Sequence, residues 1–379
     1  MSESNEDVDS AARSRQSAQP DSYEFRRRIV AEPLKHVPAL DGLRAVAVVG
    51  VMLYHARFGW ITGGFLGVSA FFTLSGFLIT SLLLREWSKS VKIDLRAFWG
   101  RRFRRLLPAS WATMALVVAI GAFGGWNGDQ LRALRGDIPF SLLEIVNWHF
   151  IWQDRSYGAG FVAPSPVEHF WSLAVEEQFY VILPVIVIGA LLLGRGRVPR
   201  YRLRNLAIIL GTLTVAGLVL NGLLSRSAST DRAYFGTDTR MAEMLIGSLL
   251  ACLTLRELRL SNQFLRRLAG ALGLVGLGVS FWLWHTAQVS ATWMYPWGLL
   301  LCALCTAAII LGSLQGGLLS RALALPPLVW LGKVSYGVYL IHWPVFLLLT
   351  PARLGWSPWP LFALRAVVTL AAATLMFHF

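Results

Sequence analysis

Residues 64–84 read GFLGVSAFFTLSGFLITSLLL, a run of 21 residues without a charged side chain. An α-helix rises 1.5 Å per residue, so the run is about 30 Å long, which matches the hydrocarbon core of a bilayer. Its apolar residues are continuous and do not alternate with polar ones, as they would in the strands of an outer-membrane barrel. The run therefore predicts a membrane-spanning α-helix.

The rest of the chain has the same character. Hydrophobic residues make up 55% of the 379 residues and charged residues only 15%. This balance excludes a soluble cytosolic enzyme, a secreted disulfide scaffold and a disordered protein. The apolar windows lie at about 39–56, 64–84, 107–124, 137–152, 170–193, 207–224, 240–255, 268–284, 295–312, 334–349 and 361–378. We expect an all-α polytopic membrane bundle.

The window at 137–152 is short and carries Asp137, Glu144, Asn147 and His149, which are costly in lipid. If this window does not span and the N-terminus is inside, the cytoplasmic segments hold 25 Lys and Arg and the outer segments hold 7. If it spans, the split becomes 18 against 14. The positive-inside rule thus predicts ten spans, one non-spanning helix on the outer side and both chain ends in the cytoplasm.

The N-terminal segment, the net charge and the cysteines limit the domain organisation and the binding partners of the chain. Residues 1–35 lack the apolar region of a signal peptide and predict a disordered cytoplasmic tail, followed by a transmembrane domain at 36–379. The net charge of +14 is carried mostly by short segments between spans, which favours membrane lipids over nucleic acid. Cys252, Cys302 and Cys305 lie inside apolar windows, so we expect neither a disulfide nor a metal site.

The first predicted span carries two ionisable side chains. Arg44 follows Leu40-Asp41-Gly42-Leu43, and His55 lies eleven residues later, about 16 Å along the helix axis. Arg44 would therefore lie near the cytoplasmic mouth and His55 in the outer half. A histidine at a helix end is commonly structural, but an ionisable residue at membrane depth indicates function. Because imidazole accepts a hydroxyl proton near neutral pH, we expect His55 to be catalytic.

Two features suit a thin phosphorylated ligand, and the second of them lies on the cytoplasmic side. Glycine and serine recur along residues 63–76, and they favour either close helix packing or a narrow slot, in which Ser75 would contact the ligand. The segment FWGRRFRRLLP at 98–108 contains Arg101, Arg102, Arg104 and Arg105. These arginines could anchor the topology or bind the phosphates of a nucleotide, to which guanidinium groups are well suited.

The segment HFWSLAVEEQFY at 169–180 brings polar groups into the bundle from the outer side. Ser172 and Glu176 share one helical face. Arg240 begins another span from the same side and could pair with Glu176, either in a functional site or as a structural ion pair. The residues that we expect on the acceptor side are His169, Trp171, Ser172, Gln178 and Arg240.

The window at 334–349 supplies a second histidine at depth. Ser335, Tyr339 and His342 fall on one helical stripe, so His342 could face His55. Alternatively, His342 is a bundle histidine satisfied by a tyrosine hydroxyl. The candidate catalytic residues are therefore His55, Arg44, Glu176, Tyr339 and His342.

Six motifs follow one another in the chain: LDGLRA with Arg-x10-His, GGFLGVSAFFTLSGFLIT, FWGRRFRRLLP, HFWSLAVEEQFY, TDTRMAEMLIGSLLA and LGKVSYGVYLIHWP. Together they resemble the membrane-bound acyltransferase 3 family of O-acyltransferases over about residues 36–379. The resemblance implies a ten-span domain in a bacterial plasma membrane that moves an acyl group from cytoplasmic acyl-CoA to a hydroxyl of an extracytoplasmic glycan or glycolipid. It also implies that His55 is the catalytic histidine, that Arg44 is its motif partner and that the 101–105 cluster borders the donor site.

Two positions depart from the family pattern. Ser69 stands where many relatives have aspartate, which removes any acidic role there, and no Glu-x-Pro segment follows the last span. The outer segment 125–169 and the TDTR motif resemble the subgroup fused to an extracytoplasmic SGNH-type domain, as in peptidoglycan O-acetyltransferases. We therefore expect a further C-terminal domain in a longer protein.

A rival function is a non-catalytic transporter or flippase of an envelope lipid or glycan, which would also need polar groups at depth. The two halves of the chain show no inverted repeat, which weakens this hypothesis. The arginine-rich cytoplasmic mouth favours an enzyme with acyl-CoA as its co-substrate. The sequence leaves the identity of the acyl group and of the acceptor open.

Overall fold

The computed structural model describes residues 36–156, 164–193, 199–227, 229–254 and 259–378. The predicted N-terminal tail lies outside the described residues. The predicted all-α fold is confirmed, since no strand occurs among the described residues. The elements are α3 (Pro38–His55), η1 (Gly64–Leu66), α4 (Gly67–Ser90), α5 (Leu95–Ala122), α6 (Gly128–Leu142), α7 (Val146–Trp152), α8 (Phe170–Leu193), α9 (Pro199–Ser227), α10 (Thr230–Phe235), α11 (Thr237–Thr254), α12 (Gln263–Thr286), η2 (Thr292–Met294), α13 (Trp297–Leu314), α14 (Gly317–Leu323), α15 (Pro326–Leu348), α16 (Pro351–Leu354) and α17 (Pro358–His378).

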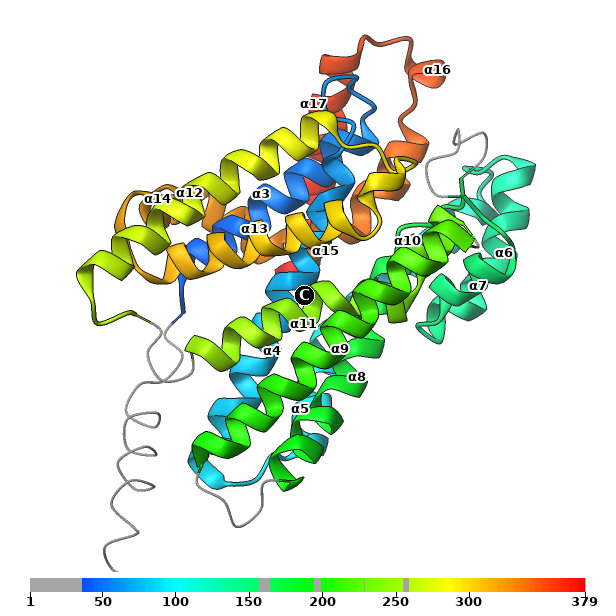
Figure 1. Ribbon diagram of the computed structural model, residues 1–379. Helices are drawn as coiled ribbons and strands as arrows, with labels where there is room; N and C mark the ends of the chain where they lie inside the picture. The colour runs from blue at the N-terminus through cyan, green and yellow to red at the C-terminus, as the bar shows by residue number, and fades with distance from the viewer. Residues whose placement is uncertain (1–35, 157–163, 194–198, 228, 255–258, 379) are drawn as a thin grey trace, which may run out of the picture.

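Long helices dominate the bundle (Figure 1). Among the described residues, seven helices are long and apolar enough to cross a membrane. An eighth is added if α14 and α15, which meet at 61°, count as one bent span. Helices α3 and α11 occupy two more of the predicted windows, so the count of ten spans stays a prediction.

The doubtful window at 137–152 forms two short helices, where we expected one non-spanning helix. Helix α6 ends at Leu142 and α7 begins at Val146, with Glu144 at a backbone φ of +53° between them. Gln178 of α8 donates a hydrogen bond of 2.7 Å to the Glu144 carbonyl, which fixes this bend against α8. Neither helix is long enough to span a bilayer.

Several helix pairs approach very closely through glycine, and two of these contacts lie between helices that form the centre of the bundle. A Cβ atom added at Gly332 of α15 would lie 1.9 Å from the Asp41 carbonyl oxygen of α3. One added at Gly247 of α11 would lie 1.9 Å from the Thr73 carbonyl oxygen of α4. Small residues thus bring backbones into contact, as is common in membrane bundles. The first of these contacts aligns α3 with α15, the two helices that carry His55 and His342.

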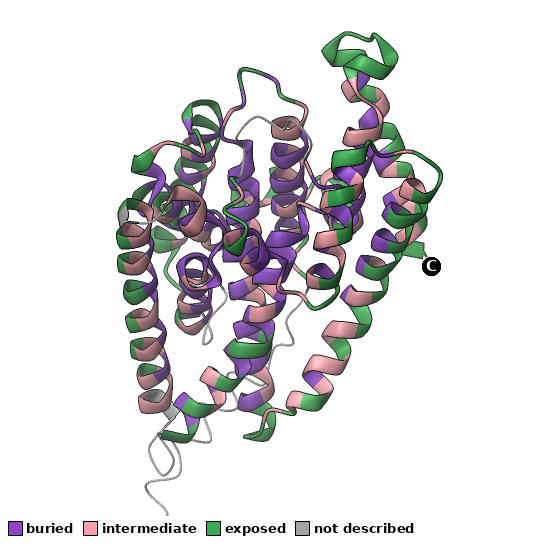
Figure 2. Ribbon diagram, turned by 90° about the vertical axis from the view of Figure 1, so that its right-hand side faces the viewer, coloured by how far each residue is buried: buried purple, intermediate pink, exposed green. Residues whose placement is uncertain are grey.

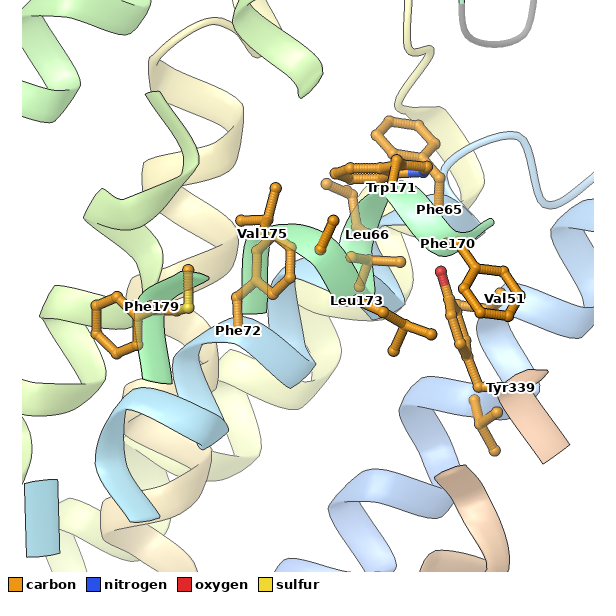
Figure 3. Packing of buried hydrophobic residues seen from close by; sticks show 14 of the residues in the cluster. Val51, Phe65, Leu66, Phe72, Phe170, Trp171, Leu173, Val175, Phe179 and Tyr339 are labelled. Atoms are coloured by element: carbon orange, nitrogen blue, oxygen red, sulfur yellow. The ribbon is translucent and has the colours of Figure 1, made fainter. Parts of the chain in front are cut away.

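The buried residues lie along the middle of the bundle, and exposed ones cover its periphery (Figure 2). The exposed side chains of the long helices include many large apolar ones, such as Val185, Val215 and Leu272. An apolar exterior is expected for a surface that faces lipid. Figure 3 shows the central packing, where Phe72 of α4 meets Trp171 of α8 and Tyr339 points toward the first turn of α8.

Candidate active site

Two histidines from different helices meet inside the bundle. His55 ends α3 and His342 lies in α15, and His55 Nδ1 is 3.0 Å from His342 Nε2. The two rings stack with their centroids 5.1 Å apart. The structure therefore brings together the two histidines that the sequence singled out.

The backbone around His342 fixes which nitrogens carry protons. His342 Nδ1 lies 2.6 Å from the Tyr339 carbonyl oxygen, so this nitrogen donates. In a neutral ring the other nitrogen, Nε2, then accepts, and it accepts from His55 Nδ1. This assignment makes Nε2 of His55 the basic nitrogen of that ring. A histidine held in one tautomer by a second polar group has the arrangement of a general base.

A third histidine and two hydroxyl groups extend this cluster. The ring of His169 lies 5.6 Å from that of His342, and its Nε2 donates to the Leu340 carbonyl oxygen at 3.0 Å. The Tyr339 hydroxyl donates to the His169 carbonyl at 3.1 Å and lies 2.6 Å from Ser172 Oγ. The loop before α8 and the middle of α15 are thereby joined at the histidine pair.

A cavity of about 100 Å³ lies on the other side of Tyr339. Its wall comes from α3, α4, α5, α8 and α15, and the part from α4 is apolar except for Ser75. Its polar lining residues are Arg44, Ser75, Arg102, Arg105, Ser172, Glu176, Glu177, Tyr180, Ser335, Tyr336 and Tyr339. Of the predicted site residues, this cavity collects Arg44, Ser75, Ser172, Glu176 and Tyr339 together with two of the four arginines of the 101–105 cluster.

Glu176 is held by a network inside this cavity. Its carboxylate accepts hydrogen bonds from the Ser75 and Tyr180 hydroxyl groups, and Arg102 Nη2 lies 3.9 Å from it. The Arg102 guanidinium also stacks on the Tyr180 ring, with 3.9 Å between Cζ and the ring centroid. Glu176 therefore holds Arg102 in the wall of the cavity.

The arginine cluster divides into different environments. Arg101, Arg102 and Arg105 line a groove of about 480 Å³ together with Lys89 and Glu86. Arg102 and Arg105 line the central cavity as well, so the groove and the cavity meet at these two side chains. Arg101 lies 3.5 Å from Glu86, whereas Arg104 is exposed and lines neither space, contrary to its expected place in the donor site.

The expected pair of Arg240 with Glu176 is wrong. Arg240 is fully buried in α11, where its Nε lies 3.0 Å from Glu243 and its Nη2 donates to Ser69 at 3.0 Å. The rings of Phe72, Trp171 and Tyr234 surround its guanidinium. Two helices that begin on one side need not turn their charged residues toward each other, and Glu176 instead faces Arg102.

Two more of the residues expected on the acceptor side have structural contacts. Trp171 is buried in the core, packed against Tyr234 and Phe235. The amide of Gln178 bonds Trp148, Asn147 and Thr237, which ties α8 to α7 and α11. Of the five, His169 and Ser172 lie at the histidine cluster.

The sequence reasoning passed over Glu177 and Tyr180, although both stand in the HFWSLAVEEQFY motif. Both line the cavity, and Tyr180 lies one helical turn after Glu176. That spacing was the available signal for Tyr180.

Two further observations concern the chemistry around the site. Just before α8, burial raises the pKa of Glu168, the neighbour of His169 in the chain, to about 7. In the part of the chain that the structure describes, no cluster of three or more His, Cys, Asp or Glu side chains is suited to a metal ion.

Several proteins of known name are similar to this chain over most of its length. The chain is 38% identical over 355 residues to the peptidoglycan O-acetyltransferase OatA of Listeria monocytogenes, covering 91% of this chain and 55% of the relative. It is 36% identical over 354 residues to YrhL of Bacillus subtilis, covering 91% and 54%. The O-acetyltransferase OatA of Staphylococcus aureus is 32% identical over 368 residues, covering 95% and 59%.

The chain thus spans a little over half the length of these curated relatives. No solved structure matches it significantly. The family model described as an acyltransferase domain, Acyl_transf_3, matches residues 37–378, nearly the whole of the chain. The chain therefore belongs to the acyltransferase 3 family.

Proposed function

We propose that this chain transfers an acyl group, acetyl in the first instance, from cytoplasmic acyl-CoA to a hydroxyl of a cell-envelope glycan on the far side of a bacterial plasma membrane. Family membership supports acyl transfer, and the names of the relatives support acetyl as the group and peptidoglycan as the acceptor. The positive-inside count supports a cytoplasmic N-terminus.

The donor enters from the arginine side. The groove beside Arg101, Arg102 and Arg105 suits the phosphates of CoA, because guanidinium groups form strong charge-assisted hydrogen bonds with phosphate. Arg102 and Arg105 belong to both spaces, so a ligand whose phosphates lie in the groove can extend into the cavity. Its far end then approaches Tyr339 and the histidine pair.

His55 acts as the general base. Its Nε2 takes the proton of the acceptor hydroxyl, and the hydroxyl oxygen attacks the thioester carbonyl carbon. As the new C–O bond forms and the C–S bond breaks, the proton passes from His55 to the leaving sulfur, which yields the ester and free CoA. His342 is a positioning residue, since it keeps His55 in the tautomer that exposes the lone pair of Nε2 to this proton.

The 3.0 Å contact between His55 Nδ1 and His342 Nε2 carries this proposal, because it gives the bundle an oriented base at the end of a ligand-sized cavity. The test is transfer of radiolabelled acetyl from acetyl-CoA to a peptidoglycan fragment by the purified chain in liposomes. We expect His55→Ala to abolish transfer. A matched control is His285→Ala at the end of α12, whose Nδ1 bonds the Trp60 carbonyl outside the site.

Two results would contradict the proposal. Normal acetyl transfer by His55→Ala would show that His55 is not the general base. Movement of a glycan lipid across the bilayer by the wild type, with no acetylated product and no loss of movement in His55→Ala, would establish the flippase function instead.

A further inference from the structure

The central cavity is long and narrow. The residues of α4 that line it extend from Val68 to Leu78, which is about 15 Å along the helix axis. Its volume is about 100 Å³, which is small for that length. A slender chain suits a space of this shape.

Three residues in the wall of this cavity have a buried polar atom without a hydrogen-bond partner among the described residues. They are Arg102, through Nε, at the side shared with the arginine groove, and farther in Glu177, through Oε2 on α8, and Ser335, through Oγ on α15. The latter two residues are deeply buried, with 8% of Glu177 and none of Ser335 exposed. The neighbouring carboxylate of Glu176 differs, because Ser75 and Tyr180 satisfy it. Glu177 and Ser335 therefore offer hydrogen bonds that the protein itself does not use.

A buried polar atom without a partner costs about 1–3 kcal/mol, and most such atoms in proteins are satisfied. A carboxyl oxygen accepts a hydrogen bond, and a serine hydroxyl donates one. A secondary amide supplies the matching pair, since its N–H donates and its carbonyl oxygen accepts. Glu177 and Ser335 line the same cavity from two different helices, so a chain with amide groups that lies in the cavity passes both residues.

We propose that Glu177 and Ser335 form a subsite for an amide of the pantetheine arm of CoA. This arm is a slender chain with two secondary amides, and it joins the phosphates of the nucleotide to the thioester sulfur. Phosphates beside Arg102 and Arg105 place the arm at the entrance of the cavity. The inference rests on the proposed use of acyl-CoA as the donor.

The test compares two ligands that share the nucleotide. CoA carries the pantetheine arm, whereas adenosine 3′,5′-bisphosphate lacks it. The dissociation constants of both are measured by titration calorimetry for the full chain in nanodiscs. The quantity of interest is the ratio of the two constants, because loss of the arm contacts changes this ratio and leaves bisphosphate binding as it was.

We expect Ser335→Ala and Glu177→Leu each to weaken CoA binding about three- to tenfold, as for one net hydrogen bond, with bisphosphate binding unchanged. Glu177→Gln retains an acceptor oxygen and should bind CoA within about twofold of the wild type. The matched control is Ser313→Ala in α13, another buried serine whose Oγ lacks a partner among the described residues and which does not line the cavity. It should leave both constants unchanged.

The outcomes separate the subsite from the donor. If the wild type binds CoA and the ratio of constants is the same in Ser335→Ala and Glu177→Leu, the subsite is wrong while the donor stands. If the wild type binds neither ligand, the acyl-CoA donor itself is wrong and the subsite falls with it. If both variants weaken both ligands equally, the two residues support the fold of the site and bind no amide.

Discussion

Removal of the His342 imidazole should slow the chemical step and leave donor binding intact. In His342→Ala the Nδ1–H of His55 loses the acceptor that lies 3.0 Å away, and this contact no longer holds the ring in its basic tautomer. Leaving a buried donor without its partner costs about 1–3 kcal/mol. If about 2 kcal/mol of this cost raises the activation free energy of the transfer step, kcat falls about thirtyfold. Loss of the base itself in His55→Ala should cost about 10²–10⁴.

The assay is steady-state acetyl transfer in liposomes with varied acetyl-CoA. We expect kcat to fall in His342→Ala, while KM for acetyl-CoA stays within about twofold, because His342 does not line the cavity. His342→Gln offers an amide oxygen as acceptor and should recover part of the loss. An unchanged kcat in His342→Ala, or a loss confined to KM, would refute the positioning role and the tautomer assignment with it.

Three further predictions concern the arginine groove, the loop before α8 and the contact between α3 and α15. Arg105→Gln should raise KM for acetyl-CoA about tenfold through loss of a charge-assisted phosphate contact, whereas Arg104→Gln should not change it; equal effects would leave the cluster as a topological anchor. The raised pKa of Glu168 means that the folded state binds its proton more tightly than the unfolded state, so stability is lost as pH rises from about 5 through 7. Glu168→Gln should therefore melt like the wild type at pH 5 and be more stable at pH 8, by up to about 3 kcal/mol, and parallel melting curves at both pH values would disprove this. Gly332→Ala forces a Cβ atom into the backbone of α3 and should lower both Tm and kcat, while Gly270→Ala, which has open space around it, should not; a normal Tm in Gly332→Ala would show that α3 and α15 can separate without cost.

The sequence predicted the long helices well because their signal is local. A continuous apolar run fixes a helix whatever it packs against. Residues 137–152 were harder, since their polar side chains excluded a span but did not indicate a bend. The bend at Glu144 depends on a hydrogen bond from Gln178, which is 34 positions away in the chain.

Site residues were predictable where spacing along one helix decided the matter. Ser335 and Tyr339 do face one cavity, as their helical stripe indicated, and His342 does reach His55. Partners across helices were not predictable in the same way. Arg240 enters the bundle as expected but turns toward Glu243, because the rotation of a helix about its axis is set by packing that no single segment encodes. For the same reason, the sequence singled out Glu176 and passed over Glu177, although both line the cavity.

The central claim is that acyl transfer crosses the membrane, and sidedness tests it most directly. In sealed liposomes of known orientation, radiolabelled acetyl-CoA is supplied on one side and a peptidoglycan fragment on the other. Labelling of Asp129→Cys in α6, whose side chain is 68% exposed, with an impermeant maleimide reports which face is outward. We predict that acetyl-CoA is used only from the face opposite position 129 and that the acetylated glycan appears on the same face as position 129. Use of acetyl-CoA from the face of position 129, or acetylated glycan on the side where the donor was supplied, would contradict the account.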